Sequence, residues 1–444
     1  MHKTGTINDI ITCKGNKKVA ANNLYDEFKW RGLIFDITEG LDETLAKEKI
    51  TAYIGFDPSA HSLHIGNLLP IIGLMHLQRC GHTPIPVAGG GTGLIGDPSG
   101  RNTERPLITK EMLEYNLGGI KEQLSRFLDF KSKTNPAIMV NNADWLTTTP
   151  LTDFLRDIGK HFSVNNMLTK ESVKMRLNGD GISYTEFSYM LLQSFDYLKL
   201  YELYGCTLQM GGSDQWGNIT AGIDLIRRVH GAKAHCLVFP LLTTSSGVKF
   251  GKSTGGGSVW LDRKLTSPYS FYQYFFNTED ADVINYLKLF TFLSQEEIAA
   301  LEEGVKNRPE KREAQRKLAQ EVTRMVHDDN ALAEAEEAAQ VLFGGRVDNL
   351  GLKNILEIFA AAPSVEITKD DISGEGMPLS DLLVRAGLAK SKGEARRLIE
   401  GGGINIQNIK ETDVKRNVSL NDAIEGRAVV LRKGQKDYRL VLVS

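Results

Sequence analysis

Apolar positions in the first half of the chain alternate between short strand-like runs and longer helix-like runs. Residues 49–56 are apolar and β-branched and end at an Asp-Pro pair, which predicts a strand. Residues 65–80 are mostly apolar and stop before Gly81, which predicts a helix that ends at a glycine. Residues 83–90 predict the next strand. A strand, a crossover helix and a strand form a βαβ unit with parallel strands.

The same alternation continues to about residue 240. Residues 185–205 predict a helix, residues 206–212 a short strand and residues 218–231 another helix. This order is typical of an α/β fold with a doubly wound parallel sheet. We therefore expect a Rossmann-like domain over residues 23–266.

The pattern changes after this domain. Residues 310–343 carry Ala, Glu, Lys and Leu at helical spacing, so we expect an all-helical domain over residues 267–360. Residues 361–376 are rich in Gly, Pro, Ser and Asp, which predicts a linker. A small α+β domain is expected over residues 377–444, with two short helices followed by a strand.

Charge is spread unevenly along a chain whose overall composition is ordinary for a globular protein. The 444 residues are 41% hydrophobic and carry a net charge of −2, which gives no overall nucleic-acid signal. Residues 377–444, however, hold 13 Lys and Arg against 8 Asp and Glu. This excess is what contact with an RNA backbone requires, and a solvated charged surface is the weaker alternative. The candidate RNA-binding residues are Arg396, Arg397, Arg432, Lys433 and Lys436.

Other features of the sequence indicate where in the cell the protein is found. No apolar run approaches the about 18 residues of a membrane span, and the polar residues 1–22 lack a secretory core, so we expect a poorly ordered extension there. The four cysteines, at positions 13, 80, 206 and 236, show no paired spacing. This spacing argues against a disulfide framework and a structural metal, and it fits a cytoplasmic protein.

Residues that can carry chemistry follow the predicted strands, where a doubly wound sheet binds its ligands. The stretch HSLHIGN, residues 61–67, places His64 and Asn67 one helical turn apart, so both can donate hydrogen bonds to one anion. Gly66 lets a flat group approach the backbone. An isolated histidine here would more often be a helix cap or a satisfied core residue, so the other motifs decide.

Three further motifs add polar groups at the same edge. AGGGTGLIGDPSGR, residues 88–101, supplies Asp97, and LQMGGSDQWGN supplies Asp214 and Gln215, whose side chains can hold hydroxyl or carbonyl groups. KFGKS, residues 249–253, places two lysines on a glycine-flanked loop. Two ammonium groups suit a polyphosphate whose charge rises at the transition state. Each motif alone is also compatible with a plain turn, so only their combination favours a site.

The pairing of HIGN with KFGKS resembles the two signature motifs of class I aminoacyl-tRNA synthetases. The stretches YIGFDPSAHSLHIGN, GDPSGR, TEFSYMLLQSFD and LQMGGSDQWGNITAG resemble the bacterial-type tyrosyl-tRNA synthetase family in particular, and the resemblance covers roughly residues 24–444. Two positions depart from the usual pattern. Asn67 stands where the first signature usually ends in histidine, and the second signature reads KFGKS rather than KMSKS.

The resemblance implies a role for each motif residue. The residues expected to bind tyrosine are Tyr53, Asp57, Asp97, Asn142, Tyr189, Gln193, Asp196, Gln209 and Gln215. The residues expected to bind ATP are Ser59, His64, Gly66, Asn67, Arg101, Arg105, Gly212, Asp214, Lys249 and Lys252. The residues expected to act in catalysis are His64, Asn67, Lys249, Lys252 and Ser253. Of these, Tyr53 and Asp196 are implied to hold the phenolic hydroxyl, while Asp97, Tyr189 and Gln193 hold the amino group.

The resemblance also implies a function and an assembly. We expect a tyrosine–tRNA ligase that uses Mg²⁺ with ATP, forms tyrosyl-adenylate and transfers tyrosine to tRNA(Tyr). A homodimer is expected, with a dimerisation insertion at about residues 125–180 and an S-four-type RNA-binding domain over residues 377–444. Two alternatives stay open: a tryptophanyl relative of the same fold, and an RNA-binding or RNA-folding protein on a synthetase scaffold.

Overall fold

The structure, a computed structural model, describes residues 23–99, 103, 106–179, 181–242, 245, 250–251, 257–341, 347, 350–360, 362–434 and 437–444. These residues form two structural units. The first contains the described residues up to Asp262 together with Thr278–Leu318, and the second contains Arg263–Asn277 together with those from Ala319 onward. The expected N-terminal extension, residues 1–22, lies outside the described residues.

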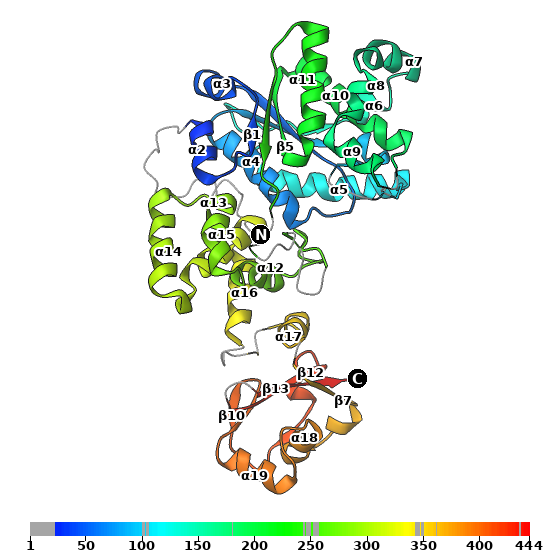
Figure 1. The fold of residues 1–444 in the computed structure, drawn as a ribbon. Helices are drawn as coiled ribbons and strands as arrows, with labels where there is room; N and C mark the ends of the chain where they lie inside the picture. The colour runs from blue at the N-terminus through cyan, green and yellow to red at the C-terminus, as the bar shows by residue number, and fades with distance from the viewer. Residues whose placement is uncertain are drawn as a thin grey trace. The chain divides into compact units, whose positions relative to one another are not determined.

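A six-stranded sheet in the order β1-β6-β5-β2-β3-β4 is the centre of the first unit (Figure 1). Its strands are β1 (Asp36–Ile37), β2 (Thr51–Phe56), β3 (Thr83–Ala88), β4 (Val140–Asn141), β5 (Cys206–Gly212) and β6 (His235–Phe239). All neighbours run parallel except β1, which pairs antiparallel with β6. The parallel doubly wound sheet predicted from the sequence is therefore confirmed.

Helices cover this sheet as the periodicity predicts. The helices of the first unit that precede β6 are α2 (Leu24–Arg31), α3 (Leu41–Lys47), α4 (Leu68–Arg79), α5 (Lys110–Phe127), α6 (Ala143–Leu146), α7 (Leu151–Asp153), α8 (Val164–Leu168), α9 (Glu171–Leu177), α10 (Tyr184–Tyr204) and α11 (Trp216–His230). Helix α4 packs on β2, β3 and β5, while α10 and α11 pack against each other and on β5. Gly81, which follows the Cys80 cap of α4, and Gly205, directly after α10, have positive φ angles, so glycine ends these helices as expected.

The helical region expected as one domain over residues 267–360 is divided between the two units. Helices α13 (Asp280–Phe290) and α14 (Gln295–Asn307) belong to the first unit, and α15 (Glu313–Val326) begins in the first and ends in the second. A buried arginine makes one of the contacts between α13 and the rest of the first unit. Arg31 on α2 donates to the backbone carbonyls of Lys288, Thr291 and Leu293 at 2.8–2.9 Å, which ties the end of α13 to the catalytic fold.

The second unit combines helices with a five-stranded sheet in the order β10-β9-β12-β13-β7. Its helices are α12 (Pro268–Phe276), α16 (Asp329–Val341), α17 (Leu352–Ile358), α18 (Leu379–Arg385) and α19 (Lys392–Glu400). Its strands are β7 (Ser364–Ile367), β8 (Met377–Pro378), β9 (Ile404–Ile406), β10 (Ile409–Glu411), β11 (Asn417–Val418), β12 (Ala428–Lys433) and β13 (Asp437–Val443). The order α18, α19, β9 matches the two helices and strand expected there.

The segment assigned to a linker, residues 361–376, contains part of this sheet instead. Strand β7 pairs parallel with β13, and Ile367 and Ile372 are almost fully buried in the core of the small domain. The sequence reading missed β7 because four residues between a proline and a charged turn give too short an alternation to recognise. In the described part of the chain, no helix is long and apolar enough to cross a membrane.

Candidate active site

A cavity of about 250 Å³ lies at the carboxyl ends of the central parallel strands. The predicted site residues that line it are Tyr53, Asp57, Ser59, His64, Asn67, Asp97, Asn142, Tyr189, Gln193, Asp196, Gln209, Gly212 and Gln215. Parallel strands all end at one edge of a sheet, so motifs far apart in sequence meet there. The clustering predicted from the sequence is therefore present in the structure.

One of the residues that line the cavity, Asp196, is a buried carboxylate held by two donors. Asn142 Nδ2 donates to Asp196 Oδ2 at 2.8 Å, and Trp145 Nε1 donates to Asp196 Oδ1 at 2.7 Å. Burial raises the pKa of Asp196 to about 7, and the hydrogen bonds from Asn142 and Trp145 oppose this rise. Asp196 therefore changes its protonation close to neutral pH.

Two polar atoms in the central strands beside Asp196 lack a partner. The Tyr53 hydroxyl on β2 and Gln209 Oε1 on β5 are buried and make no hydrogen bond. Tyr53 is 2% exposed, and burial raises the pKa of its hydroxyl well above the usual range, so the neutral phenol can both donate and accept. An unpaired buried polar group costs about 1–3 kcal/mol, which a ligand hydroxyl can recover.

A second carboxylate, Asp57, joins the glycine-rich loop to α10. Thr92 Oγ1 donates to Asp57 Oδ1 at 2.7 Å, and the Tyr189 hydroxyl donates to Asp57 Oδ2 at 2.9 Å. Thr92 also accepts from Asn142 Nδ2 at 2.9 Å. Burial and the nearby Asp57 raise the pKa of Tyr189 well above its usual range, so Tyr189 stays a neutral donor.

Asp97 anchors a third polar group, which is formed largely by amides. Gln215 Nε2 donates to Asp97 Oδ2 at 2.6 Å, and the backbone N–H of Ser99 donates to Asp97 Oδ1 at 2.9 Å. Gln193, one turn from Tyr189 on the same face of α10, accepts from Asn218 Nδ2 at 3.0 Å. The group thus combines a carboxylate with amide oxygens, as an ammonium ligand requires.

The HIGN motif forms a capping box at the short 3-10 turn, Ile65–Asn67, that leads into α4. The backbone N–H of Gly66 donates to His64 Nδ1, and the backbone N–H of His64 donates to Asn67 Oδ1, both at 3.0 Å. Since Nδ1 accepts, the neutral imidazole carries its proton on Nε2, and Asn67 keeps its Nδ2 hydrogens as donors. A Cβ on Gly66 would lie 2.8 Å from the His64 ring, so only glycine fits there.

The described part of the KFGKS motif lies directly against HIGN. A Cβ on Gly251 would lie 3.0 Å from Ile65, and Gly251 has a φ of 95°, which favours glycine. The ring of Phe250 stacks on Phe290 of α13 at 5.1 Å and meets Tyr286 at 5.2 Å. The two signature motifs are therefore neighbours. Lys249, Lys252 and Ser253 lie outside the described residues, as do Arg101 and Arg105.

Two of the predicted site residues lie next to the cavity without lining it. Three residues that make hydrogen bonds to the site were not predicted from the sequence. Gly66 and Asp214 are not among the lining residues, although Asp214 lies against the backbone of Gly212 and Gly66 against His64. The missed residues are Thr92, Trp145 and Asn218. The general rule that a buried indole N–H needs an acceptor gives a weak signal for Trp145. Thr92 and Asn218 give no such signal.

Comparison with known proteins gives a consistent family assignment. Residues 45–344 match the family described as tRNA synthetases class I (W and Y). The chain is 56% identical over 419 residues to the tyrosine–tRNA ligase of Roseiflexus castenholzii, covering 94% of this chain and 99% of that protein. Tyrosine–tRNA ligase 1 of Bacillus subtilis is 50% identical over 423 residues, covering 94% and 99%.

The C-terminal region decides between the tyrosine and tryptophan branches. Residues 354–441 match the domain described as the tyrosine–tRNA ligase SYY-like C-terminal domain. The chain belongs to the tyrosine–tRNA ligase family. A C-terminally truncated mitochondrial tyrosyl-tRNA synthetase of Aspergillus nidulans has a similar solved structure, with a TM-score of 0.67, 30% identity, and coverage of 76% of this chain and 97% of that one. The family predicted from the motifs is confirmed.

The basic residues expected to bind RNA in this tyrosine–tRNA ligase family member differ in exposure. Arg396 and Arg397 are exposed on α19. Arg432 and Lys433 on β12 are half-buried: the Arg432 guanidinium lies over the Tyr438 ring, and Lys433 Nζ donates to the Leu388 carbonyl at 2.9 Å. These contacts give Arg432 and Lys433 a structural role within the small domain. Lys436 lies outside the described residues.

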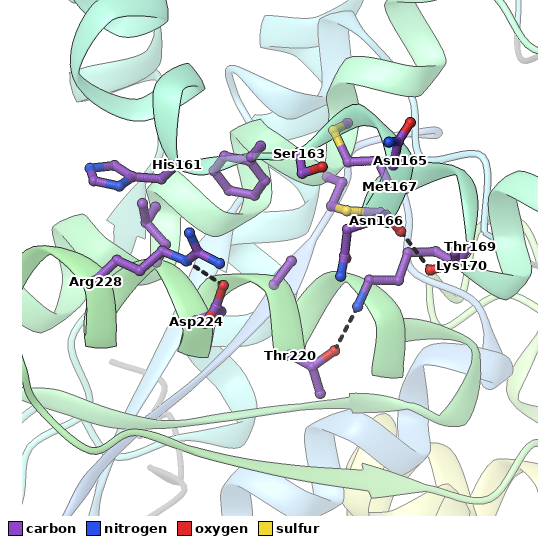
Figure 2. A pocket seen from close by; sticks show the side chains of 14 residues that line it. His161, Ser163, Asn165, Asn166, Met167, Thr169, Lys170, Thr220, Asp224 and Arg228 are labelled. Atoms are coloured by element: carbon purple, nitrogen blue, oxygen red, sulfur yellow. Dashed lines mark hydrogen bonds and ion pairs between the residues drawn. The ribbon is translucent and has the colours of Figure 1, made fainter.

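A larger cavity, of about 670 Å³, lies between the region 161–170 and helices α10 and α11 (Figure 2). Lys170 Nζ donates to Thr220 Oγ1 at 3.4 Å, and Arg228 pairs with Asp224 at 2.6 Å. Burial lowers the pKa of Lys170. None of the residues expected to bind tyrosine or ATP lines this cavity, so the smaller cavity is the candidate active site of the tyrosine–tRNA ligase family member.

Proposed function

We propose that the protein activates L-tyrosine with Mg·ATP and transfers it to the terminal ribose of tRNA(Tyr). One observation carries this proposal. The hydroxyl of Tyr53, which has no partner, and the carboxylate of Asp196 both line the same buried end of the cavity. A phenolic hydroxyl can donate to Asp196 and exchange a hydrogen bond with Tyr53. Phenylalanine offers neither interaction, so it would leave the Tyr53 hydroxyl unpaired and give Asp196 no further donor.

The other polar groups set the direction in which tyrosine lies. The ammonium group is assigned to Asp97, with Tyr189 and Gln193 beside it, because these residues supply a charge and acceptors. The carboxylate then faces the HIGN motif at the mouth of the cavity. The remaining residues of the tyrosine set, Asp57, Asn142, Gln209 and Gln215, hold these groups in place or close the walls.

The reaction needs no protein nucleophile. The tyrosine carboxylate attacks the α-phosphorus of ATP, a P–O bond forms, and the bond to the β-phosphate oxygen breaks as pyrophosphate leaves. Nε2–H of His64 and the Nδ2 hydrogens of Asn67 are assigned to the pyrophosphate as its charge grows, because the capping bonds use the other atoms of these side chains. Lys249, Lys252, Arg101 and Arg105 are assigned to the same phosphates, Ser59 and Gly66 to the ATP wall, and Gly212 with Asp214 to the ribose.

The second step uses the adenylate as an activated acyl group. The terminal ribose hydroxyl of tRNA attacks the tyrosyl carbonyl carbon, and AMP leaves with the electrons of the broken C–O bond. No described group of three or more His, Cys, Asp or Glu residues can hold a metal ion, and Mg²⁺ is assigned to ATP as part of the substrate. Positioning and charge stabilisation then account for catalysis.

We propose a homodimer that forms through the insertion. Several large apolar side chains of this region are exposed, namely Leu151, Leu155, Val164, Leu168, Met175 and Leu177, and so is Tyr184 at the start of α10. Monomeric proteins rarely expose so many apolar side chains within one short region.

We also propose a cytoplasmic location, because the three described cysteines, Cys80, Cys206 and Cys236, are free thiols, which a reducing compartment preserves.

The test of the proposed function is aminoacylation of tRNA. Purified protein is incubated with ATP, Mg²⁺, total bacterial tRNA and labelled tyrosine or tryptophan, and acid-precipitable label is measured. The proposal requires tyrosine-dependent charging. Charging with tryptophan but not tyrosine would refute it.

Removing the Tyr53 hydroxyl is expected to reduce selectivity for tyrosine over phenylalanine. In Tyr53→Phe the tyrosine hydroxyl loses one neutral hydrogen bond, so kcat/KM for tyrosine falls by about 3- to 10-fold, which corresponds to about 0.5–1.5 kcal/mol. The value for phenylalanine stays the same or rises, and KM for ATP is little changed. Tyrosine-specific synthetases are themselves a standard example of selection through a hydroxyl. An unchanged ratio in ATP–pyrophosphate exchange contradicts the assignment.

The pKa of Asp196 predicts that kcat/KM for tyrosine depends on pH, with one rising limb in the pH profile. Since burial raises this pKa to about 7, Asp196 is largely protonated below pH 7 and ionised above it. The ionised form accepts the phenolic hydrogen, so kcat/KM for tyrosine should rise as the pH increases through 7. The measurement is a pH profile of pyrophosphate exchange. Asp196→Asn should lack this limb, and the parent protein should also lack it with phenylalanine. A limb that persists in Asp196→Asn belongs to another group.

A further inference from the structure

Asn218 is a buried polar residue that touches the amino-group end of the proposed tyrosine site without lining the cavity. It lies on α11 and is 4% exposed. We infer that Asn218 is the positioning residue for recognition of the tyrosine amino group, through its contacts with Gln193, Gln215 and Ser99. The inference rests on the proposed function, since it assigns a role within that same site.

The Asn218 side chain joins three separate elements. Its Nδ2 donates to Gln193 Oε1 of α10 at 3.0 Å, to Gln215 Oε1 before α11 at 3.3 Å, and to Ser99 Oγ in the loop after β3 at 3.3 Å. An amide nitrogen has two hydrogens, so the three acceptors share them and the shortest contact is the strongest. One side chain therefore holds the helix, the loop and the turn in a common geometry.

Both oxygens of Asp97 depend on partners that Asn218 touches. Gln215 donates to one oxygen of Asp97 and accepts from Asn218, and Ser99 donates its backbone N–H to the other while its hydroxyl oxygen faces Asn218. Asn218 thus contacts Gln215 and Ser99, and these two residues in turn donate hydrogen bonds to Asp97. The groups that orient the Asp97 carboxylate, which binds the ammonium group, are therefore themselves held by Asn218.

The chemistry of the amides gives Asn218 a directional role. Because Asn218 donates, Gln215 must present its oxygen to Asn218 and its NH₂ to Asp97. If the Gln215 amide turned over, an oxygen would face the carboxylate of Asp97 and two NH₂ groups would face each other. The same donor fixes the oxygen of Gln193. Asn218 therefore selects one orientation for both glutamine amides, which apolar packing cannot do.

Two substitutions separate this role from simple packing. Asn218→Ala removes the donor and leaves space, whereas Asn218→Asp keeps the shape but replaces the NH₂ with an oxygen that repels the glutamine oxygens. Both should weaken tyrosine binding by about tenfold or more, the size expected when a buried polar partner is lost. Leu225→Ala, in the buried face of the same helix, is the control for a general loss of stability.

The decisive measurement compares tyrosine with 3-(4-hydroxyphenyl)propionic acid, which lacks only the amino group. Dissociation constants are measured by calorimetry or equilibrium dialysis on the intact chain. In Asn218→Ala and Asn218→Asp, tyrosine should lose about tenfold in affinity or more, while the analogue changes by less than about threefold. The ratio of kcat/KM between tyrosine and phenylalanine should stay as in the parent. Leu225→Ala should lower Tm without separating the two ligands.

Three outcomes overturn the inference. Asn218→Asp that binds tyrosine as tightly as the parent shows that no donor is needed. Equal weakening of tyrosine and the analogue shows a general structural role, and an effect confined to the tyrosine-to-phenylalanine ratio places Asn218 at the hydroxyl end. A parent protein that does not bind tyrosine refutes the proposed function itself, which is a distinguishable result.

Discussion

Replacing His64 with asparagine should slow tyrosyl-adenylate formation by about 100- to 1,000-fold, with little change in tyrosine affinity. The lost group is Nε2–H, which the proposed function assigns to the phosphates of ATP, and losing one preorganised donor to a developing oxyanion costs about 3–4 kcal/mol. In the same proposal tyrosine is bound by other residues, Tyr53, Asp196 and Asp97. The rate is measured by rapid quench under single-turnover conditions.

Asparagine is chosen because His64 also caps a helix. Its Nδ1 accepts the backbone N–H of Gly66, and an asparagine oxygen is a good acceptor at the same position. His64→Asn therefore retains the cap and loses the distal donor, whereas His64→Ala loses both. We expect similar rates for the two variants but a lower Tm for His64→Ala alone. A near-normal rate in His64→Asn would show that capping is the main role of His64.

Reversing the charge of Arg396 and Arg397 together should separate the two reaction steps. These side chains are exposed on α19, and no residue assigned to tyrosine or ATP lies in the second unit. Arg396→Glu with Arg397→Glu should weaken tRNA(Tyr) binding by at least about tenfold at physiological salt and lower the salt slope of binding by about two. ATP–pyrophosphate exchange without tRNA should keep its parent rate.

Charge reversal is a cleaner test than deletion of the small domain. Tyr438 and Leu440 of β13 share a buried cluster with Ile355 and Phe359, so deletion would expose apolar surface in the remaining part of this unit. The matched control is Arg396→Lys with Arg397→Lys, which preserves the charge and should preserve most tRNA binding. Unchanged aminoacylation in the double glutamate variant would show that α19 does not contact tRNA.

The backbone of the catalytic fold follows from local signals in the sequence. Strand β2, helix α4 and strand β3 each show their own periodicity, and Gly81 marks the end of the helix, so the βαβ unit could be predicted from residues 49–90. The rule that ligands bind at strand ends then placed His64 and Asp97 on one edge. These steps need no knowledge of long-range packing.

The hydrogen bonds that complete the site could not be predicted in this way. Trp145 reaches Asp196 across 51 positions and Asn218 reaches Ser99 across 119, so each contact exists only once the sheet has brought distant segments together. Strand β7 is too short to show a periodicity of its own, and its pairing with β13 depends on partners about 76 positions away. Nor does residue type reveal that Arg31 ties α13 to the catalytic unit.

The most direct test of the central claim is ATP–pyrophosphate exchange with tyrosine, phenylalanine and tryptophan measured in parallel on the intact protein. A buried site built around the hydroxyl of Tyr53 and the carboxylate of Asp196 predicts rapid exchange with tyrosine and kcat/KM values for phenylalanine and tryptophan that are lower by several orders of magnitude. Exchange that is as efficient with phenylalanine or tryptophan as with tyrosine, or absent with all three, would contradict it.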